Sequence, residues 1–530
     1  MSSLDSDVAC ALVHEAVAAH REHDLPAVLS LASTCRAIRH AALAVLFASV
    51  RWPHQNKHDD DAGLHFFPPA LWPYFRRFQL VWPEDWPEAT PPRWGDRYYV
   101  GGDYNPRHID KLVAALPAMP ALESFYLSCP FYPPNSLLGA LIRCRALRDL
   151  AIDETPLSIS MAPRVPREFY LDRLAIVPVG EAVRVGDGPV CSRYAERAYY
   201  VREYRKKYKN DVLARRATTA FVFDVGKPAH LRHVQLSADL CALRALAEHR
   251  WPCLGTLVLT GHAPRGAPGE VLDVLAGMPA LRELRLLFAK VKGEPGLRVL
   301  PEDPPAHPAV LAQLTHLAVS NACCLEGVFR YTTGLERLAV LAIIDLPRVP
   351  IALGRADVER VVRDLAVGCR AGPGRLRGMR IMVEDKVGPE MCAAIARCCR
   401  GLEALEIELC GYHDGKSIHA WEEFSDALAP MGALRELRIC IQFPEFDEAD
   451  PYEPWRNARM ECARFLAGRL ASLRRVGLEF RKRVGTHRFE DSWLEFEVER
   501  DAGARVVALR ERGPTWYMFP EVWVPVSVPA

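Results

Sequence analysis

The sequence predicts an α/β repeat fold, a right-handed solenoid with a parallel β-sheet on its concave face and helices outside. Two observations predict it. A phrase of the pattern apolar-x-x-apolar-x-apolar recurs along the chain, most clearly as ALRELRL at 280–286 and ALRELRI at 433–439. Helix-compatible segments that end in a breaker precede several copies, as at 271–279 and 424–432. Helix, break and strand therefore alternate, and parallel strands joined by helical crossovers stack into a solenoid.

Each copy of the phrase is expected to form a short strand whose alternate side chains enter a core. Ten looser copies accompany the two clear ones, and the first apolar residue of each is a leucine. These leucines are Leu122, Leu147, Leu171, Leu231, Leu254, Leu281, Leu314, Leu335, Leu376, Leu402, Leu434 and Leu473. About half of the intervals between them match the roughly 20–29 residues of a leucine-rich repeat, and the longer intervals indicate insertions. The alternative, a doubly wound α/β domain, does not explain so many similar phrases.

Length and composition limit the function. A chain of 530 residues is too long for one compact core, whereas a solenoid grows by adding units. Because the net charge is +1, there is no electrostatic case for binding nucleic acid or an anionic membrane. The longest apolar stretch, 41–50, is too short to span a membrane, and the acidic N-terminus does not resemble an export signal. We therefore expect a cytoplasmic or nuclear protein.

Catalytic and metal-binding motifs are missing from the sequence. It contains no Gly-x-Ser-x-Gly, His-Glu-x-x-His or Cys-x-x-Cys pattern, so neither an enzyme nor a cofactor or metal is expected. A Gly-Lys-Ser loop at 410–417 has only three residues between Gly411 and Gly415, one fewer than a phosphate-binding loop needs. The sixteen cysteines are scattered, and we interpret them as reduced, buried residues.

Residues 1–52 do not follow the repeat and are predicted to form a small module of three helices. A first helical stretch covers 4–20, and a second begins after Asp24, a candidate N-cap, and runs through 25–52. Helices this short cannot bury all of their apolar residues among themselves. A binding partner is therefore expected for this module.

The second half of this module resembles an F-box of the form that precedes the repeats of many fungal proteins. The resemblance is carried by Leu29, Leu31, Cys35, Arg36, Ile38, Leu43, Leu46, Phe47 and Val50. The opening of the F-box is represented by Leu4-Asp5-Ser6-Asp7-Val8, without the proline of the family. The resemblance implies a receptor subunit of an SCF-type E3 ubiquitin ligase, which docks the adaptor and through it a cullin. The implied adaptor-binding residues are Val8, Leu12, Leu25, Leu29, Leu31, Cys35 and Ile38.

Two alternatives stay open for this organisation. The N-terminal helices could instead be a cap that shields the first repeat, as every solenoid requires one. The chain would then be a leucine-rich-repeat interaction scaffold with no ubiquitin-ligase role. In either case we expect a protein partner, and the sequence does not identify it.

Three irregular regions complete the organisation. Residues 53–120 are rich in Trp and Pro and contain a degenerate first repeat at 73–80; its tryptophans either pack the loop or form a ligand platform. The repeats over 121–500 are interrupted at about 178–229 by a basic, tyrosine-rich insertion centred on 193–216, which is either a solvated arm or a substrate contact. Residues 501–530 supply a last strand and an apolar tail that either covers the repeats or binds a partner.

The outward-facing strand residues of the two clearest phrases are candidates for substrate contact. Charged side chains alternate there with core residues, and the outward positions of a concave sheet form its recognition surface. The candidates are Arg282, Glu283, Arg285, Arg435, Glu436 and Arg438. The alternative is that they satisfy one another as cross-strand pairs.

Overall fold

The structure is a computed structural model, and it describes residues 36–53, 66–81, 109–128, 133–153, 157, 165–177, 212–264, 270–288, 297–299, 309–320, 323–324, 327–341, 353–371, 376–383, 386–409, 419–441, 443, 446–447, 451–483 and 489–516. The chain divides into two compact units. Unit 1 comprises Met1–Val179, Asp211–Leu231 and Pro525–Ala530, and unit 2 comprises Gly180–Asn210 and Arg232–Val524. The Gly-Lys-Ser loop and most of the basic insertion lie outside the described residues.

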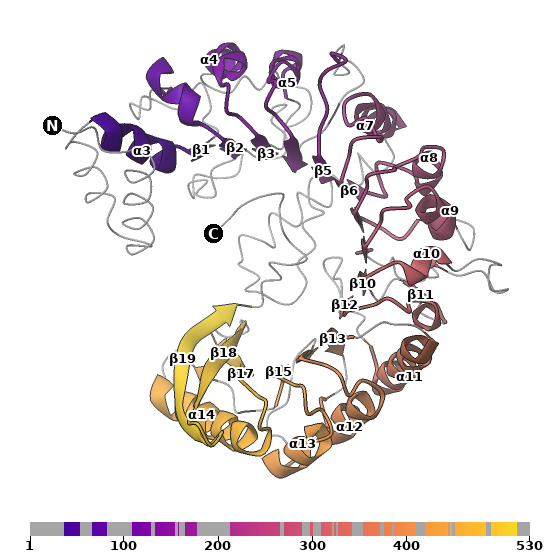
Figure 1. The fold of residues 1–530 in the computed structure, drawn as a ribbon, viewed down its shortest axis with the longest axis vertical. Helices are drawn as coiled ribbons and strands as arrows, with labels where there is room; N and C mark the ends of the chain where they lie inside the picture. Colours follow the sequence, from indigo (N-terminus) through magenta and orange to yellow (C-terminus); the bar gives the residue numbers. More distant parts are fainter. Residues whose placement is uncertain are drawn as a thin grey trace, which may run out of the picture. The chain divides into compact units, whose positions relative to one another are not determined.

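Unit 1 contains a parallel sheet in which successive strands are neighbours (Figure 1). Its strands are β1 (Ser49–Pro53), β2 (Arg77–Val81), β3 (Ser124–Ser128), β4 (Asp149–Asp153) and β5 (Arg173–Val177). Its helices are α3 (Arg36–Leu46), η1 (Pro69–Tyr74), α4 (Ile109–Ala115), η3 (Leu116–Ala118), α5 (Asn135–Ile142) and α7 (Val212–Asp224). The alternation of strand and helix is the predicted one.

Unit 2 continues the same pattern and ends differently. Its main parallel strands, each paired with the next, are β6 (His233–Ser237), β7 (Thr256–Thr260), β8 (Glu283–Leu286), β10 (His316–Ser320), β12 (Arg337–Leu341), β13 (Gly378–Val383), β14 (Ala404–Leu409), β15 (Glu436–Ile439) and β17 (Arg475–Arg483). The short β16 (Phe446–Asp447) also pairs with β17, and β9 (Leu297–Arg298) pairs with β11 (Cys323–Cys324). An antiparallel hairpin, β18 (Phe489–Arg500) and β19 (Val506–Trp516), then completes the sheet.

The helices of unit 2 that the structure describes lie along one face of its sheet, as Figure 1 shows; the other face, on which no described helix lies, is called the helix-free face. They are α8 (Leu243–Ala247), α9 (Glu270–Ala276), α10 (Ala309–Ala312), η5 (Val328–Arg330), α11 (Arg355–Ala371), α12 (Pro389–Cys398), α13 (Trp421–Leu428) and α14 (Tyr452–Arg469). Each crossover places a helix between two parallel strands. Several side chains on this helix-free face are nevertheless buried, among them those of Glu406 and Glu408.

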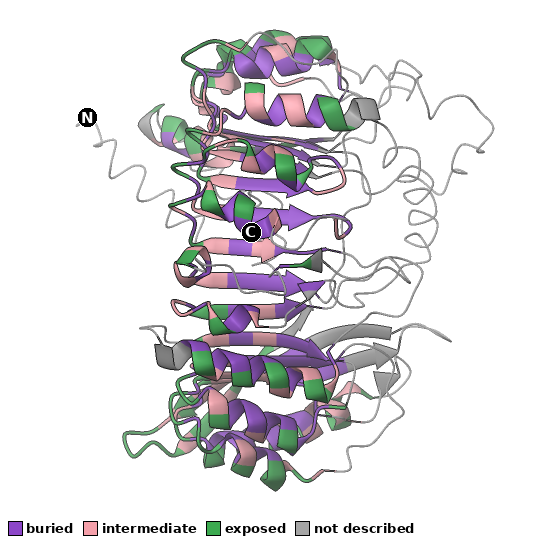
Figure 2. Ribbon diagram, turned by 90° about the vertical axis from the view of Figure 1, so that its right-hand side faces the viewer, coloured by how far each residue is buried: buried purple, intermediate pink, exposed green. Residues whose placement is uncertain are grey.

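The leucines of the repeated phrase form the core. All twelve first leucines are buried, with at most 5% of each exposed, and a strand begins two or three residues later in every copy. The degenerate repeat expected at 73–80 likewise forms β2, where Phe78 and Leu80 are buried. Figure 2 shows the buried residues concentrated on the strands and on the inner sides of the helices. The predicted strand positions are therefore confirmed.

The first strand of the sheet begins earlier in the chain than the repeat pattern indicates. β1 pairs in parallel register with β2, from Ser49 with Arg77 to Pro53 with Val81. The boundary expected at residue 52 therefore falls inside a strand of unit 1. The side chain of Trp52 is buried there and makes edge contacts with Phe66 and Phe67.

Aromatic packing holds this first repeat together. The indole Nε1 of Trp72 donates a hydrogen bond to the carbonyl oxygen of Phe67 at 3.0 Å, and its ring lies near that of Phe66. Phe78 of β2 stacks on Phe125 of β3, with 5.7 Å between ring centroids. Trp72 thus packs the loop, one of the two roles considered for the tryptophans of this region, whereas Trp82, Trp86 and Trp94 lie outside the described residues.

The end of the basic insertion and the start of the apolar tail both belong to regular elements. α7 covers 212–224, and Phe221 and Val222 are buried while Arg215 and Arg216 are exposed. Residues up to Trp516 belong to β19. The insertion therefore closes with an ordinary repeat helix, and the tail starts later than its composition indicates.

The cysteines that the structure describes are free, and most of them are buried. Burial raises the pKa of Cys144 and of Cys392 to about 12, because a thiolate is poorly solvated in the core. No cluster of potential metal ligands occurs in the described part of the chain. Among the same residues, no helix has the length and apolarity that crossing a membrane requires.

Candidate functional site

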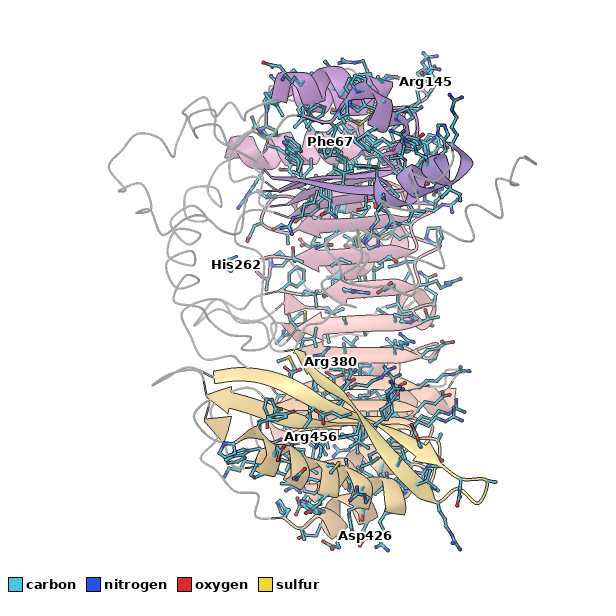
Figure 3. The ribbon with its side chains drawn as sticks, turned by 90° about the vertical axis from the view of Figure 1, so that its left-hand side faces the viewer. Phe67, Arg145, His262, Arg380, Asp426 and Arg456 are labelled. Atoms are coloured by element: carbon cyan, nitrogen blue, oxygen red, sulfur yellow. The ribbon has the colours of Figure 1, made fainter. Side chains whose placement is uncertain are left out.

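The helix-free face of unit 2 carries charged side chains on its C-terminal strands. Side chains alternate along a strand, so Glu406 and Glu408 of β14 point to this face while Leu405 and Ile407 point to the core. Arg380 occupies the corresponding position on β13 (Figure 3). These groups form the start of a connected network.

The first part of the network joins β13 to β14. Arg380 lies 2.9 Å from a carboxylate oxygen of Glu406 and donates a hydrogen bond of 2.9 Å to Glu408. The side chain of Glu408 is only 2% exposed. Burying a carboxylate is costly unless it is paired, so Arg380 is what makes this acid tolerable on the sheet.

The second part joins β14, β15 and β18 through one arginine. Arg438 donates to Glu406 at 2.9 Å and to Glu495 at 2.7 Å. Glu495 lies on β18, opposite Gly477 of β17, so the arginine side chain crosses a whole strand. A Cβ atom at residue 477 would stand 2.8 Å from Cγ of Arg438. Glycine is therefore required for space at this position, and we name Arg380, Glu406, Glu408, Arg438 and Glu495 the charged network.

The charged network raises the pKa of one of its groups, the Arg438 guanidinium. Burial lowers the pKa of the Arg438 guanidinium, but the charges of Glu406 and Glu495 more than offset this, and the pKa is raised overall. Two guanidinium groups face three carboxylates, so the network is slightly acidic.

A second row of ion pairs runs beside the network. Glu436 of β15 pairs with Arg475 of β17, and Glu497 of β18 pairs with Arg512 of β19 at 2.9 Å. These pairs are more exposed than the charged network, so water screens them and each stabilises the fold little. Each pair combines one acid with one arginine, so this row adds no net charge to the helix-free face.

The six candidate contact residues are divided between two places. Glu436 and Arg438 lie on β15, next to or within the charged network, and both are engaged in cross-strand ion pairs. Glu283 and Arg285 form an ion pair within β8, at 2.6 Å, which β10 to β14 separate from β15. Arg282 donates to two backbone carbonyls.

Arg435 is exposed at the beginning of β15. Residue patterns alone did not single out Arg380, Glu406, Glu408 or Glu495. The available signal was the alternation of charged and apolar residues in EIEL at 406–409 and the single arginine that begins RIMV at 380–383.

Of the implied adaptor-binding residues, the structure describes only Ile38. It lies on α3 and is half-buried, while Ala41 and Ala42 on the same helix are buried. Val8, Leu12, Leu25, Leu29, Leu31 and Cys35 lie outside the described residues. The adaptor-binding assignment stays a prediction.

Comparison with known proteins shows likeness in structure only. No family model matches the chain, and no curated protein matches it in sequence. A chain from the crystal structure of a TLR13–ssRNA13 complex is 12% identical with a TM-score of 0.34, covering 79% of this chain and 54% of its own. A chain from the yeast Rad7–Elc1 complex is 11% identical with a TM-score of 0.31, covering 76% of this chain and 88% of its own. This chain thus spans about half the length of the TLR13 complex chain.

Neither likeness says what this chain binds. Its own strands, helices and buried leucines define the class: an α/β repeat protein with leucine-rich units.

Proposed function

We propose that this chain is the substrate receptor of an SCF-type E3 ubiquitin ligase. Residues 4–52 dock the adaptor subunit, and the helix-free face of unit 2 binds a target protein. The observation that carries the proposal is the row of partly exposed ion pairs on the helix-free face, Glu436–Arg475 and Glu497–Arg512, which lies beside the mostly buried charged network. The receptor contributes proximity, because it holds the target where a ubiquitin-conjugating enzyme reaches its lysines.

The adaptor half of the proposal rests on the F-box resemblance and is supported by α3. Ile38, Leu43, Val45 and Leu46 of this helix are only half-buried. Partly covered apolar side chains at this density are typical of a helix that docks a partner. An adaptor seated on them would complete their burial.

A scaffold without a ubiquitin-ligase role is the second candidate, and β1 favours it. The last residues of the F-box-like stretch form a strand of the unit 1 sheet, as a capping repeat would. Under this alternative the repeats still bind a protein, and the N-terminal helices serve only to cover the first repeat.

Co-purification with the SCF adaptor separates the two candidates. The truncation should remove residues 1–35, since a cut at 52 would delete part of β1 and destabilise unit 1. A second variant, Ile38→Asp, places a charge on α3, and Val367→Asp, at an exposed position on α11, is its matched control. We expect wild type and Val367→Asp to retain the adaptor and the other two to lose it. If folded wild type does not bind the adaptor, or the truncation binds it equally well, the ligase proposal is wrong.

A further inference from the structure

Charged residues line the edge of the unit 2 sheet at which the strands begin. The residue just before each strand bonds to its counterpart on the preceding strand: Glu403 N–H to Arg377 O at 2.7 Å, Arg435 N–H to Glu403 O at 2.8 Å, and Arg474 N–H to Arg435 O at 2.7 Å. Arg377, Glu403, Arg435 and Arg474 are therefore neighbours along one line, with about 4.8 Å between strands.

This line has an excess of positive charge. Arg377, Arg435 and Arg474 are exposed, as is Arg400 in the turn that leads into β14. Two acids lie in the same line: Glu403, 3.9 Å from Arg377, and exposed Glu336, whose carbonyl oxygen accepts from Arg377 N–H at 2.8 Å. We name Arg377, Arg400, Glu403, Arg435 and Arg474 the arginine edge.

The guanidinium groups at the C-terminal end of the arginine edge have no partner among the residues that the structure describes. At the equivalent position before β8, Arg282 donates to the carbonyl oxygens of Leu281 and Gln313, both at 3.4 Å. Within the part of the chain that the structure describes, the guanidinium groups of Arg435 and Arg474 form neither such bonds nor ion pairs. Like charges side by side on neighbouring strands are unfavourable. A bound anionic group would relieve this repulsion.

We propose that the arginine edge binds an acidic segment of the target protein. The inference rests on the proposed function only in taking the target to be a protein. Carboxylates of such a segment would pair with Arg435 and Arg474, which lie on neighbouring strands and whose guanidinium groups have no partner among the described residues. Arg377 and Arg400 would extend the contact along the edge, and complementary charge would speed association and favour acidic partners.

The pattern of charge favours a polypeptide over nucleic acid. Glu403 within the line and Glu436 directly beside it would repel an uninterrupted chain of phosphates. The described residues of the edge include no exposed aromatic side chain on which bases could stack. A segment whose acids are separated by small neutral residues suits this alternation.

The test is fluorescence anisotropy with the full-length chain and a labelled peptide in which glutamates alternate with serines. The variant is Arg435→Glu with Arg474→Glu. Its matched control is Arg363→Glu with Arg464→Glu, which reverses two exposed arginines on the helices α11 and α14. Circular dichroism verifies that both variants are folded.

We expect the glutamate peptide to bind wild type and the control equally, and the edge variant about tenfold more weakly or worse. Binding should also weaken as salt is added. Equal binding by the edge variant, or no peptide binding at low salt, would overturn the inference. Tighter binding of a single-stranded RNA through the same two arginines would also overturn it. The adaptor plays no part in this assay, so it fails or succeeds independently of the ligase proposal.

Discussion

Gly477 is predicted to be essential for the charged network, although it carries no side chain. Replacing it with alanine adds one methyl group on the helix-free face of β17. That Cβ would lie 2.8 Å from Cγ of Arg438 and 3.5 Å from its Cβ and Cδ. Because these atoms lie near the root of the side chain, Arg438 must leave its rotamer, and its bonds to Glu406 and Glu495 are lost.

The size of the effect follows from two opposing contributions. Alanine in place of glycine stabilises a compatible site by about 0.4–1 kcal/mol, since the unfolded chain loses freedom. Breaking a buried ion pair costs about 3–5 kcal/mol. The Arg438 side chain is 37% exposed, so screening reduces this cost to about 1–3 kcal/mol. Gly477→Ala should therefore lower the free energy of unfolding by about 1–2 kcal/mol.

Urea unfolding measures the change in the free energy of unfolding. Because the chain has two units, hydrogen exchange at the amides of β17 and β18 then shows that the change occurs at this part of the sheet. The control is Gly468→Ala in α14, where a Cβ meets nothing within 4 Å and which should stabilise by up to about 1 kcal/mol. In an Arg438→Ala background, Gly477→Ala should stop destabilising. If Gly477→Ala stabilises wild type as Gly468→Ala does, the reasoning about Arg438 is refuted.

Three further predictions concern other parts of the chain. Gly226→Ala should lower the free energy of unfolding of unit 1 by about 2 kcal/mol, because the added Cβ would collide with the carbonyl oxygen of Val222. Urea unfolding measures this change, and an unchanged free energy of unfolding would contradict the prediction. A thiol reagent should modify the exposed Cys253 in the folded chain and should reach Cys392 only after unfolding, because burial raises the pKa of Cys392 to about 12. Mass spectrometry of the digested protein would show which cysteine is modified. The backbone N–H of Ala420, at the start of α13, donates a hydrogen bond to Glu423 and lowers the pKa of its carboxyl group. The stability that this carboxylate contributes is therefore present above its unfolded pKa and is lost as pH falls through the folded pKa. Glu423→Gln should remove this pH dependence from amide exchange at the start of α13 and leave other helices unchanged.

The sequence alone determined the repeating core. Side chains alternate between the two faces of a strand, so the spacing of apolar residues along the sequence shows which residues face the core. This spacing is a local property of the sequence. Leu281, Leu284 and Leu286 are buried as the phrase predicts, and β18 and β19 are present as the two expected last strands. The strand at 49–53, in contrast, was not predicted, because these residues were assigned to the helical module that ends at residue 52.

The tertiary structure alone decided which charges meet. Arg438 was predicted as an outward residue, yet its partner Glu495 is 57 residues further along the chain and on an antiparallel strand. The intervals between repeats range from 21 to 60 residues, so spacing does not show which side chains share a row. Nothing in the sequence distinguishes Gly477 from other strand residues. Only the structure shows that the side chain of Arg438 occupies the space next to it. Periodicity records the face on which a residue lies, whereas its neighbours on that face depend on strand register, which only the folded chain sets.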